Sequence, residues 1–253
     1  MRNVPLPATR SSYYHASRAP RYSLTFVLPL LVLYEVLAVI VNQDVTQGLR
    51  NGADVLLKSL FVALAGTRGP LIFGVILVGI IAWLVIRDRR ANPGPLRGRV
   101  FAGMMLESVV LALALGVVVG ILTAQLVAAI PGLAAGPFDE GGWVAGLMIS
   151  LGAGLYEELL FRVLLVTALL YLARRLLGLG PVASGVVGVL GGALIFSSFH
   201  YIGPYGDALE VGSFVFRTIA GLVFSGLYVT RGFGITAWTH ALYDVFLITA
   251  HRG

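Results

Sequence analysis

Three charged side chains lie close together in a stretch of the chain that is otherwise apolar. Glu157, Glu158 and Arg162 fall within six residues of one another. A charged side chain at membrane depth costs roughly 2.5–3.5 kcal/mol on insertion scales, so such residues tend to be functional. On a helix, Glu158 and Arg162 share one face and can neutralise each other, whereas Glu157 points about 100° away. Glu157 is therefore the candidate general base, and the other two form a supporting ion pair.

Two of the four histidines lie in or at the edge of later apolar stretches. His200 ends one such stretch, and His240 begins the motif H-A-L-Y-D, which ends at Asp244. Asp244 is one helical turn after His240, on the same face. A single histidine in a membrane is often a satisfied packing residue. Convergence of Glu157, His200, His240 and Asp244 from separate helices would explain all four together.

Three chemistries could use these four polar residues. A carboxylate and a histidine can activate water, while the remaining groups stabilise an oxyanion. Two histidines with two acids, Glu157, His200, His240 and Asp244, are also a plausible ligand set for a divalent metal. A relay of protons or cations through a transporter is the third chemistry. The HExxH pattern of helix-borne zinc sites is absent, and spacing alone does not choose among the three.

The composition indicates an integral membrane protein. The 253 residues are 58% hydrophobic and only 12% charged, with a mean hydropathy of +0.90. A soluble domain has about 25% charged residues. The net charge is +6, but the arginines lie between apolar stretches, where they orient helices and meet anionic lipids, so we expect no nucleic-acid partner. Absence of cysteine excludes disulfides, thiolate metal sites and a cysteine nucleophile.

The apolar stretches predict an all-α fold, a polytopic transmembrane bundle of about seven to eight helices. Seven stretches are long enough to cross a bilayer, and Val55 to Ala65 is a shorter element that could lie in the interface. The seven are Tyr22 to Val41, Pro70 to Ile86, Phe101 to Ile130, Trp143 to Ala173, Pro181 to Phe199, Val211 to Thr230 and Gly232 to Ala250.

The distribution of charge predicts the orientation of the bundle. Basic clusters occur in the amino-terminal tail and at 87–99, 174–175 and 231, and the acidic loops at 139–140 and 207–210 alternate with them. By the positive-inside rule, residues 1–21 form a cytoplasmic tail, and residues 22–253 form one transmembrane domain. We therefore expect a multi-pass protein of the cell membrane. Its usage of arginine, glycine and alanine is compatible with a bacterial inner membrane.

The stretch from Trp143 to Ala173 would be about 46 Å long as one straight helix, which exceeds a simple crossing. Gly152 and Gly154 offer a place where it could break or bend. They could also admit a substrate backbone, or they could serve helix packing. Three other charges in or near apolar stretches, Glu35, Glu107 and Arg217, receive no role from the sequence.

Three motifs in this order resemble those of the CPBP intramembrane protease family, which comprises CAAX-type, Rce1-like and bacteriocin-processing (Abi) proteins. The motifs are Glu157-Glu158-x-x-x-Arg162, Phe196-x-x-x-His200 and His240-x-x-x-Asp244. Each motif is short, but three in order within a helical membrane chain are fairly specific. The resemblance covers roughly residues 100–250, which would be the protease-like core.

The resemblance implies an intramembrane endopeptidase of the glutamic type that needs no metal or other cofactor. Glu157 would act with His200 to activate water, and His240 with Asp244 would form the oxyanion site. Glu158 and Arg162 would be supporting residues. The partners would be the lipid bilayer and a protein or peptide substrate in or at the membrane.

Asp244 departs from the pattern of the prenyl-protein proteases that this chain resembles, which carry asparagine there. An ionised carboxylate cannot donate a hydrogen bond as an amide does. Either Asp244 is protonated, or it orients His240, which would itself donate, and we expect the second. The competing hypothesis is a non-enzymatic membrane protein, either a transporter or a scaffold or immunity factor on the same fold. A transporter would more often show inverted repeats, and none stands out.

Overall fold

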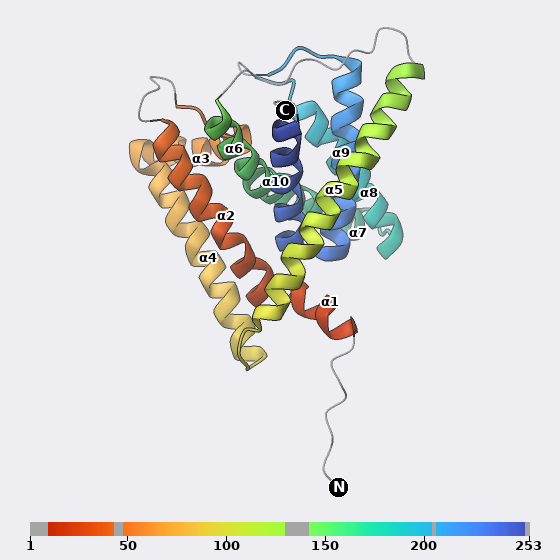
Figure 1. Ribbon diagram of the computed structural model, residues 1–253. Helices are drawn as coiled ribbons and strands as arrows, with labels where there is room; N and C mark the ends of the chain where they lie inside the picture. The colour runs from red at the N-terminus through yellow and green to blue at the C-terminus, as the bar shows by residue number, and fades with distance from the viewer. Residues whose placement is uncertain (1–9, 43–47, 130–141, 204–205, 251–253) are drawn as a thin grey trace.

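The computed structural model describes residues 10–42, 48–129, 142–203 and 206–250, and within these ranges the chain is helical without strands (Figure 1). The predicted all-α class is confirmed. The acidic residues Asp139 and Glu140 lie outside the described ranges. The elements are α1 (Arg10–Arg18), α2 (Pro20–Val41), α3 (Gly52–Ala65), η1 (Gly66–Arg68), α4 (Gly69–Ala91), α5 (Gly98–Ala129), α6 (Trp143–Gly152), η2 (Ala153–Val166), α7 (Thr167–Leu176), α8 (Pro181–Phe199), α9 (Val211–Arg231) and α10 (Phe233–Ala250).

Five of the described helical segments are long and apolar enough to cross a membrane. Their outward faces carry exposed large apolar side chains, among them Val75, Leu113 and Leu190. This arrangement suits contact with lipid, and the chain is a membrane protein. The five are Pro20–Val41, Gly52–Ala91, Gly98–Leu122, Pro181–Phe199 and Val211–Arg231.

Two further helical segments, α10 and the run from α6 to α7, correspond to the other two predicted crossings. They carry the charged motif residues, and the count of seven to eight is therefore roughly supported. Helix α10 lies in the middle of the bundle and packs against α2, α5, α6, η2 and α9 (Figure 1). Polar side chains in a membrane are stabilised inside a bundle, and this explains why these two segments are its inner helices.

A glycine sets the close approach of η2 to α10. A Cβ atom on Gly154 would lie 2.4 Å from the carbonyl oxygen of Ala237 and 2.7 Å from the backbone nitrogen of Ala241. Small residues let helix backbones approach in lipid, and Ala237 and Ala241 are fully buried at this contact. Gly154 is thus a packing residue, and it brings the polar side chains of the two helices within reach of each other.

The segment from α6 to α7 does not break at Gly152, contrary to one expectation from the sequence. The backbone at Gly152 is helical, with φ −64° and ψ −41°. The chain widens instead into a π-helix over Ala153–Val166, which ends where the Thr167 N–H reaches the Arg162 carbonyl five residues back. π-helical turns are rare and often occur at functional sites. Gly152 also serves packing, because a Cβ there would lie 2.5 Å from the Tyr34 ring.

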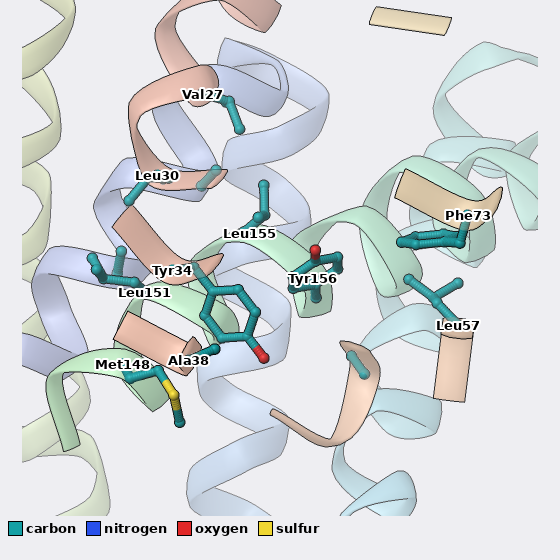
Figure 2. Close-up of a cluster of buried hydrophobic side chains, with 13 residues drawn as sticks. Val27, Leu30, Tyr34, Ala38, Leu57, Phe73, Met148, Leu151, Leu155 and Tyr156 are labelled. Atoms are coloured by element: carbon teal, nitrogen blue, oxygen red, sulfur yellow. The ribbon is translucent and has the colours of Figure 1, made fainter. Parts of the chain in front are cut away.

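Helix α3 is short and folds back on α4. Its 14 residues span about 21 Å, which is too little to cross a bilayer. Gly66 adopts a positive φ of 57° at its end and reverses the chain. Figure 2 shows the apolar cluster that joins α2, α3, α4 and η2, in which the rings of Tyr34 and Tyr156 lie 5.2 Å apart. This packing fixes the start of α3 beside η2.

Helix α1 falls within the predicted tail and packs on the bundle. Its Tyr13 hydroxyl donates a hydrogen bond of 2.7 Å to Glu107 of α5. Arg231 at the end of α9 binds both oxygens of Glu107, at 2.5 and 2.7 Å. A bidentate arginine–carboxylate pair is one of the stronger polar contacts in proteins. Glu107 therefore ties α1, α5 and α9 together at one end of the molecule.

Substitution of Gly154 tests the close contact between η2 and α10. Gly154→Ala should destabilise the protein by about 1–3 kcal/mol, because its methyl group meets backbone atoms that cannot move alone. Gly79→Ala is the control, since no atom lies within 4 Å of a Cβ built there. Thermal unfolding of the detergent-solubilised variants should show a lower melting temperature for Gly154→Ala only. Equal melting temperatures would contradict the packing described.

Candidate active site

Glu158 lies at the centre of a buried polar cluster between η2 and α10. Its Oε1 is 2.7 Å from Nδ1 of His240, and its Oε2 is 3.2 Å from Nε of Arg162. The side chains of Glu158 and Arg162 are fully buried. The helical spacing predicts the pair of Glu158 and Arg162, whereas the contact with His240 requires the two helices to meet. Glu158 therefore holds a group on its own helix and a group on α10.

Aromatic rings surround the Arg162 guanidinium. Its central carbon lies 4.4 Å from the ring centroid of Phe196 on α8 and 5.6 Å from that of Phe224 on α9. Cation–π contacts of this kind gain strength when they are desolvated. The His240 ring stacks on Phe224, the second of these two aromatic rings, with centroids 4.2 Å apart and an interplanar angle of 21°. Helices α8 and α9 thus supply apolar faces that orient the charged groups.

His240 has a carboxylate near each ring nitrogen. Nε2 lies 3.5 Å from Oδ2 of Asp244, one turn further along α10, while Nδ1 contacts Glu158. The His240 side chain is 6% exposed, and that of Asp244 is 27% exposed. The shorter contact is with Glu158, so the ring orientation that we expected from Asp244 is set at least as much by Glu158. Asp244 lies on the more accessible side of the imidazole.

Glu157 is half-buried, and its closest polar partner comes from a distant part of the chain. The Asn51 side chain donates a hydrogen bond of 2.8 Å from Nδ2 to Oε1 of Glu157. Sequence reasoning missed Asn51. The available signal was its place just before a helix, since asparagine is a preferred helix N-cap. That signal predicts a cap for α3 and does not predict a contact with Glu157.

His200 is the C-cap residue that follows α8, and its Nδ1 lies 2.9 Å from the carbonyl oxygen of Phe196. Its ring is half-buried and interacts electrostatically with Glu157. Glu157 interacts electrostatically with His240 as well, and Asp244 interacts with both Glu157 and His240. Glu157 is therefore the one of the four that interacts with each of the other three, and convergence of all four in one catalytic site stays a prediction.

Arg217 and Glu35, two of the charged residues to which the sequence assigned no role, form ion pairs. Arg217 on α9 pairs with Asp207 at 2.6 Å, and the backbone N–H of Asp207 donates to the carbonyl of His200. Glu35 pairs with Lys58 at 2.9 Å and accepts a hydrogen bond from the Tyr156 hydroxyl. The first pair anchors the chain that follows His200, and the second joins α2, α3 and η2.

No group of three or more histidine, aspartate and glutamate side chains is arranged to hold a metal ion in the part of the chain that the structure describes. The geometry therefore identifies no metal ligand set from this part. That the protein needs no cofactor stays a prediction.

Comparison with known proteins found one matching family model. Residues 139–246 match the family model described as Type II CAAX prenyl endopeptidase Rce1-like, which confirms the resemblance seen in the motifs. The matched region contains all seven named residues of the three motifs, and α1 to α5 lie outside it. A search of curated proteins and a search of solved structures found no match.

Removal of the Arg162 charge tests the buried cluster. Arg162→Leu should lower the free energy of unfolding by roughly 3–5 kcal/mol, because it removes one of the two cationic partners of the buried Glu158 and leaves only His240. Arg90→Leu, at an exposed arginine near the end of α4, makes the same chemical change and should leave stability nearly unchanged. Chemical unfolding in detergent measures both variants. Similar losses in the two variants would contradict a buried ion pair.

Proposed function

Because residues 139–246 match the Rce1-like family, we propose that this membrane protein is a glutamic-type intramembrane endopeptidase. Its substrate would be a protein or peptide held in or at the membrane. The observation that carries the proposal is the buried His240 ring, which lies 2.7 Å from Glu158 and 3.5 Å from Asp244 and joins η2 to α10. Glu157 interacts electrostatically with both His240 and His200. Such groups tend to meet in a membrane protein for chemistry or transport, and the family favours hydrolysis.

Glu157 and His200 are suited to activate the attacking water. Among the described contacts, no hydrogen bond or ion pair joins them directly, although they interact electrostatically. A water molecule between them would donate one proton towards the Glu157 carboxylate and be oriented by the His200 ring. Its oxygen then adds to the scissile carbonyl carbon as the proton passes to Glu157. The product of this step is a tetrahedral intermediate with a negatively charged oxygen.

His240 is suited to stabilise that oxyanion. Glu158 holds its Nδ1 at 2.7 Å, so the ring presents Nε2 towards Asp244 and the more exposed side of the site. With carboxylates at both nitrogens, the imidazolium form donates from each of them. Asp244 would stabilise this form, and the Nε2–H would be shared with the oxyanion. Donors fixed in position before the reaction are the main source of such stabilisation.

Collapse of the intermediate completes the reaction. The carbon–nitrogen bond breaks as the oxyanion returns to a carbonyl, and Glu157 gives its proton to the leaving amine. The site returns to its starting charge, and water supplies the oxygen of the new carboxyl group. No electron acceptor is needed.

The charge distribution of the chain supports a particular depth of the site in the membrane. With a cytoplasmic amino terminus, Glu157 and His200 would both lie towards the extracytoplasmic ends of their helices. The site would then open in the outer half of a bacterial inner membrane and would suit substrates that are exported or anchored at the surface.

Loss of the proposed base should abolish processing in cells. Glu157→Gln keeps the size of the side chain and should lower cleavage by about 10²–10⁴-fold, the usual contribution of a general base. Quantitative proteomics of protein termini should show termini that form in wild-type cells and are lost with Glu157→Gln. The control is Glu210→Gln, the same change at an exposed glutamate before α9. Identical termini in all three strains would favour a scaffold on this fold.

Two substitutions of Asp244 separate its proposed roles. Asp244→Asn should retain most activity, because the amide oxygen still accepts from the ring and the amide N–H can donate to the oxyanion. Asp244→Ala should lower the rate by about 10²-fold, because the charged form of His240, which donates to the oxyanion, loses the carboxylate that stabilises it. Formation of a Glu157-dependent terminus measures both. An equal loss in the two variants would reject this role.

A further inference from the structure

Asn51 is buried beside Glu157 although it lies outside the region of family similarity. It is the residue before α3, and only 4% of its surface is exposed. Its Nδ2 donates to Oε1 of Glu157 at 2.8 Å, across 106 positions in the sequence. Buried amides with both ends occupied are held in one orientation, so this contact is a fixed part of the site.

The orientation of the Asn51 amide follows from its second partner. The backbone N–H of Ala53 donates to Oδ1 at 2.9 Å, which makes Asn51 the N-cap of α3. An N–H can only donate, so the oxygen must face Ala53 and the NH2 group must face Glu157. An ionised carboxylate can only accept, and the two contacts therefore satisfy each other.

A chain of hydrogen bonds holds Asn51 itself. Its backbone N–H donates to the Tyr34 hydroxyl at 3.2 Å, and that hydroxyl donates to Asp54 at 2.8 Å. Asp54 is fully buried and pairs with Arg50 at 2.9 Å and Lys58 at 2.7 Å. These contacts fix the start of α3 against α2, and they leave the side chain of Asn51 little freedom to move.

We infer that Asn51 is a positioning residue for Glu157. Its N–H occupies one carboxylate oxygen and fixes the plane of the group, so that the other oxygen is directed to take the proton from water. Among the described residues, Oε2 of Glu157 receives no hydrogen bond. The inference rests on the proposed role of Glu157 as the base. It assigns to α3 a part in the reaction that the motif residues do not supply.

The charged groups that act on Glu157 come from several helices. His200 on α8, His240 on α10 and Arg162 on its own helix all interact with it electrostatically. Asn51 also contacts Glu157, but it carries no charge. A neutral substitution there changes the hydrogen bond while the charge around Glu157 stays constant.

Two substitutions keep the helix cap and remove the donor. Serine and aspartate cap helices about as well as asparagine, so Asn51→Ser should retain the melting temperature of the wild type. Asn51→Asp should retain it at low pH only, because at neutral pH its carboxylate is repelled by that of Glu157. Neither presents an amide N–H to Glu157. Asn51→Ala loses the cap as well and serves as the structural control.

Infrared spectroscopy of the purified, lipid-reconstituted protein reports on Glu157 directly. The bands of its carboxylate are those that disappear in Glu157→Gln. They should shift in Asn51→Ser, because one oxygen has lost its hydrogen bond. Unchanged bands in Asn51→Ser would overturn the inference. This measurement needs no substrate, so it still decides about Asn51 if Glu157→Gln leaves all cellular termini unchanged and the proposed function fails.

Formation of the Glu157-dependent terminus, followed in isolated membranes, provides the second measurement. Asn51→Ser should slow it by about 10- to 100-fold at every pH, the effect of losing a hydrogen bond to a charged group. Asn51→Asp should be slow at neutral pH and recover relative to Asn51→Ser as the pH falls, because a protonated aspartate again donates to Glu157. A wild-type rate in Asn51→Ser, or equal losses without this pH dependence, would overturn the inference.

Discussion

A single carboxylate joins the two helices on which the site is built. Glu158 reaches Arg162 on its own helix and His240 on α10, and all three side chains are removed from both lipid and water. In such a medium, a charge without a partner costs several kcal/mol. The helices can therefore approach only in the register that pairs these groups. That register also sets where Glu157 lies and which nitrogen of His240 is available.

The bilayer explains why the rest of the chain is arranged around this pair. Apolar helices such as α4 and α8 face outwards, where lipid requires only hydrocarbon surface. The segments that carry the charged motif residues, η2 and α10, lie inside, and Gly154 lets their backbones come close enough for polar contacts to form. The Phe196 and Phe224 rings then lie against the Arg162 guanidinium and stabilise its charge in the absence of water.

The fold class and most helices could be predicted from hydropathy, because a bilayer demands long apolar segments. Helical spacing also predicted the local pairs, Glu158 with Arg162 and His240 with Asp244. The contact of Glu158 with His240 depends on how two distant helices rotate about each other, and spacing within one segment carries no such information. The π-helix and the contact of Asn51 arise in the same way, since tertiary packing decides both. Gly152 was expected to allow a helix break, but the helix continues through it, and its missing side chain leaves room for the Tyr34 ring.

The short hairpin of α3 and α4 has a consequence for what counts as the functional unit. Similarity to the family begins at residue 139, yet the partner of Glu157 enters from a turn far upstream of that boundary. A chimera that receives only the region of similarity would contain every motif residue but would lack Asn51, the hydrogen-bond partner of Glu157. Under the proposed mechanism, two chains with the same motifs and different amino-terminal halves would hold the base differently and would therefore differ in catalytic rate.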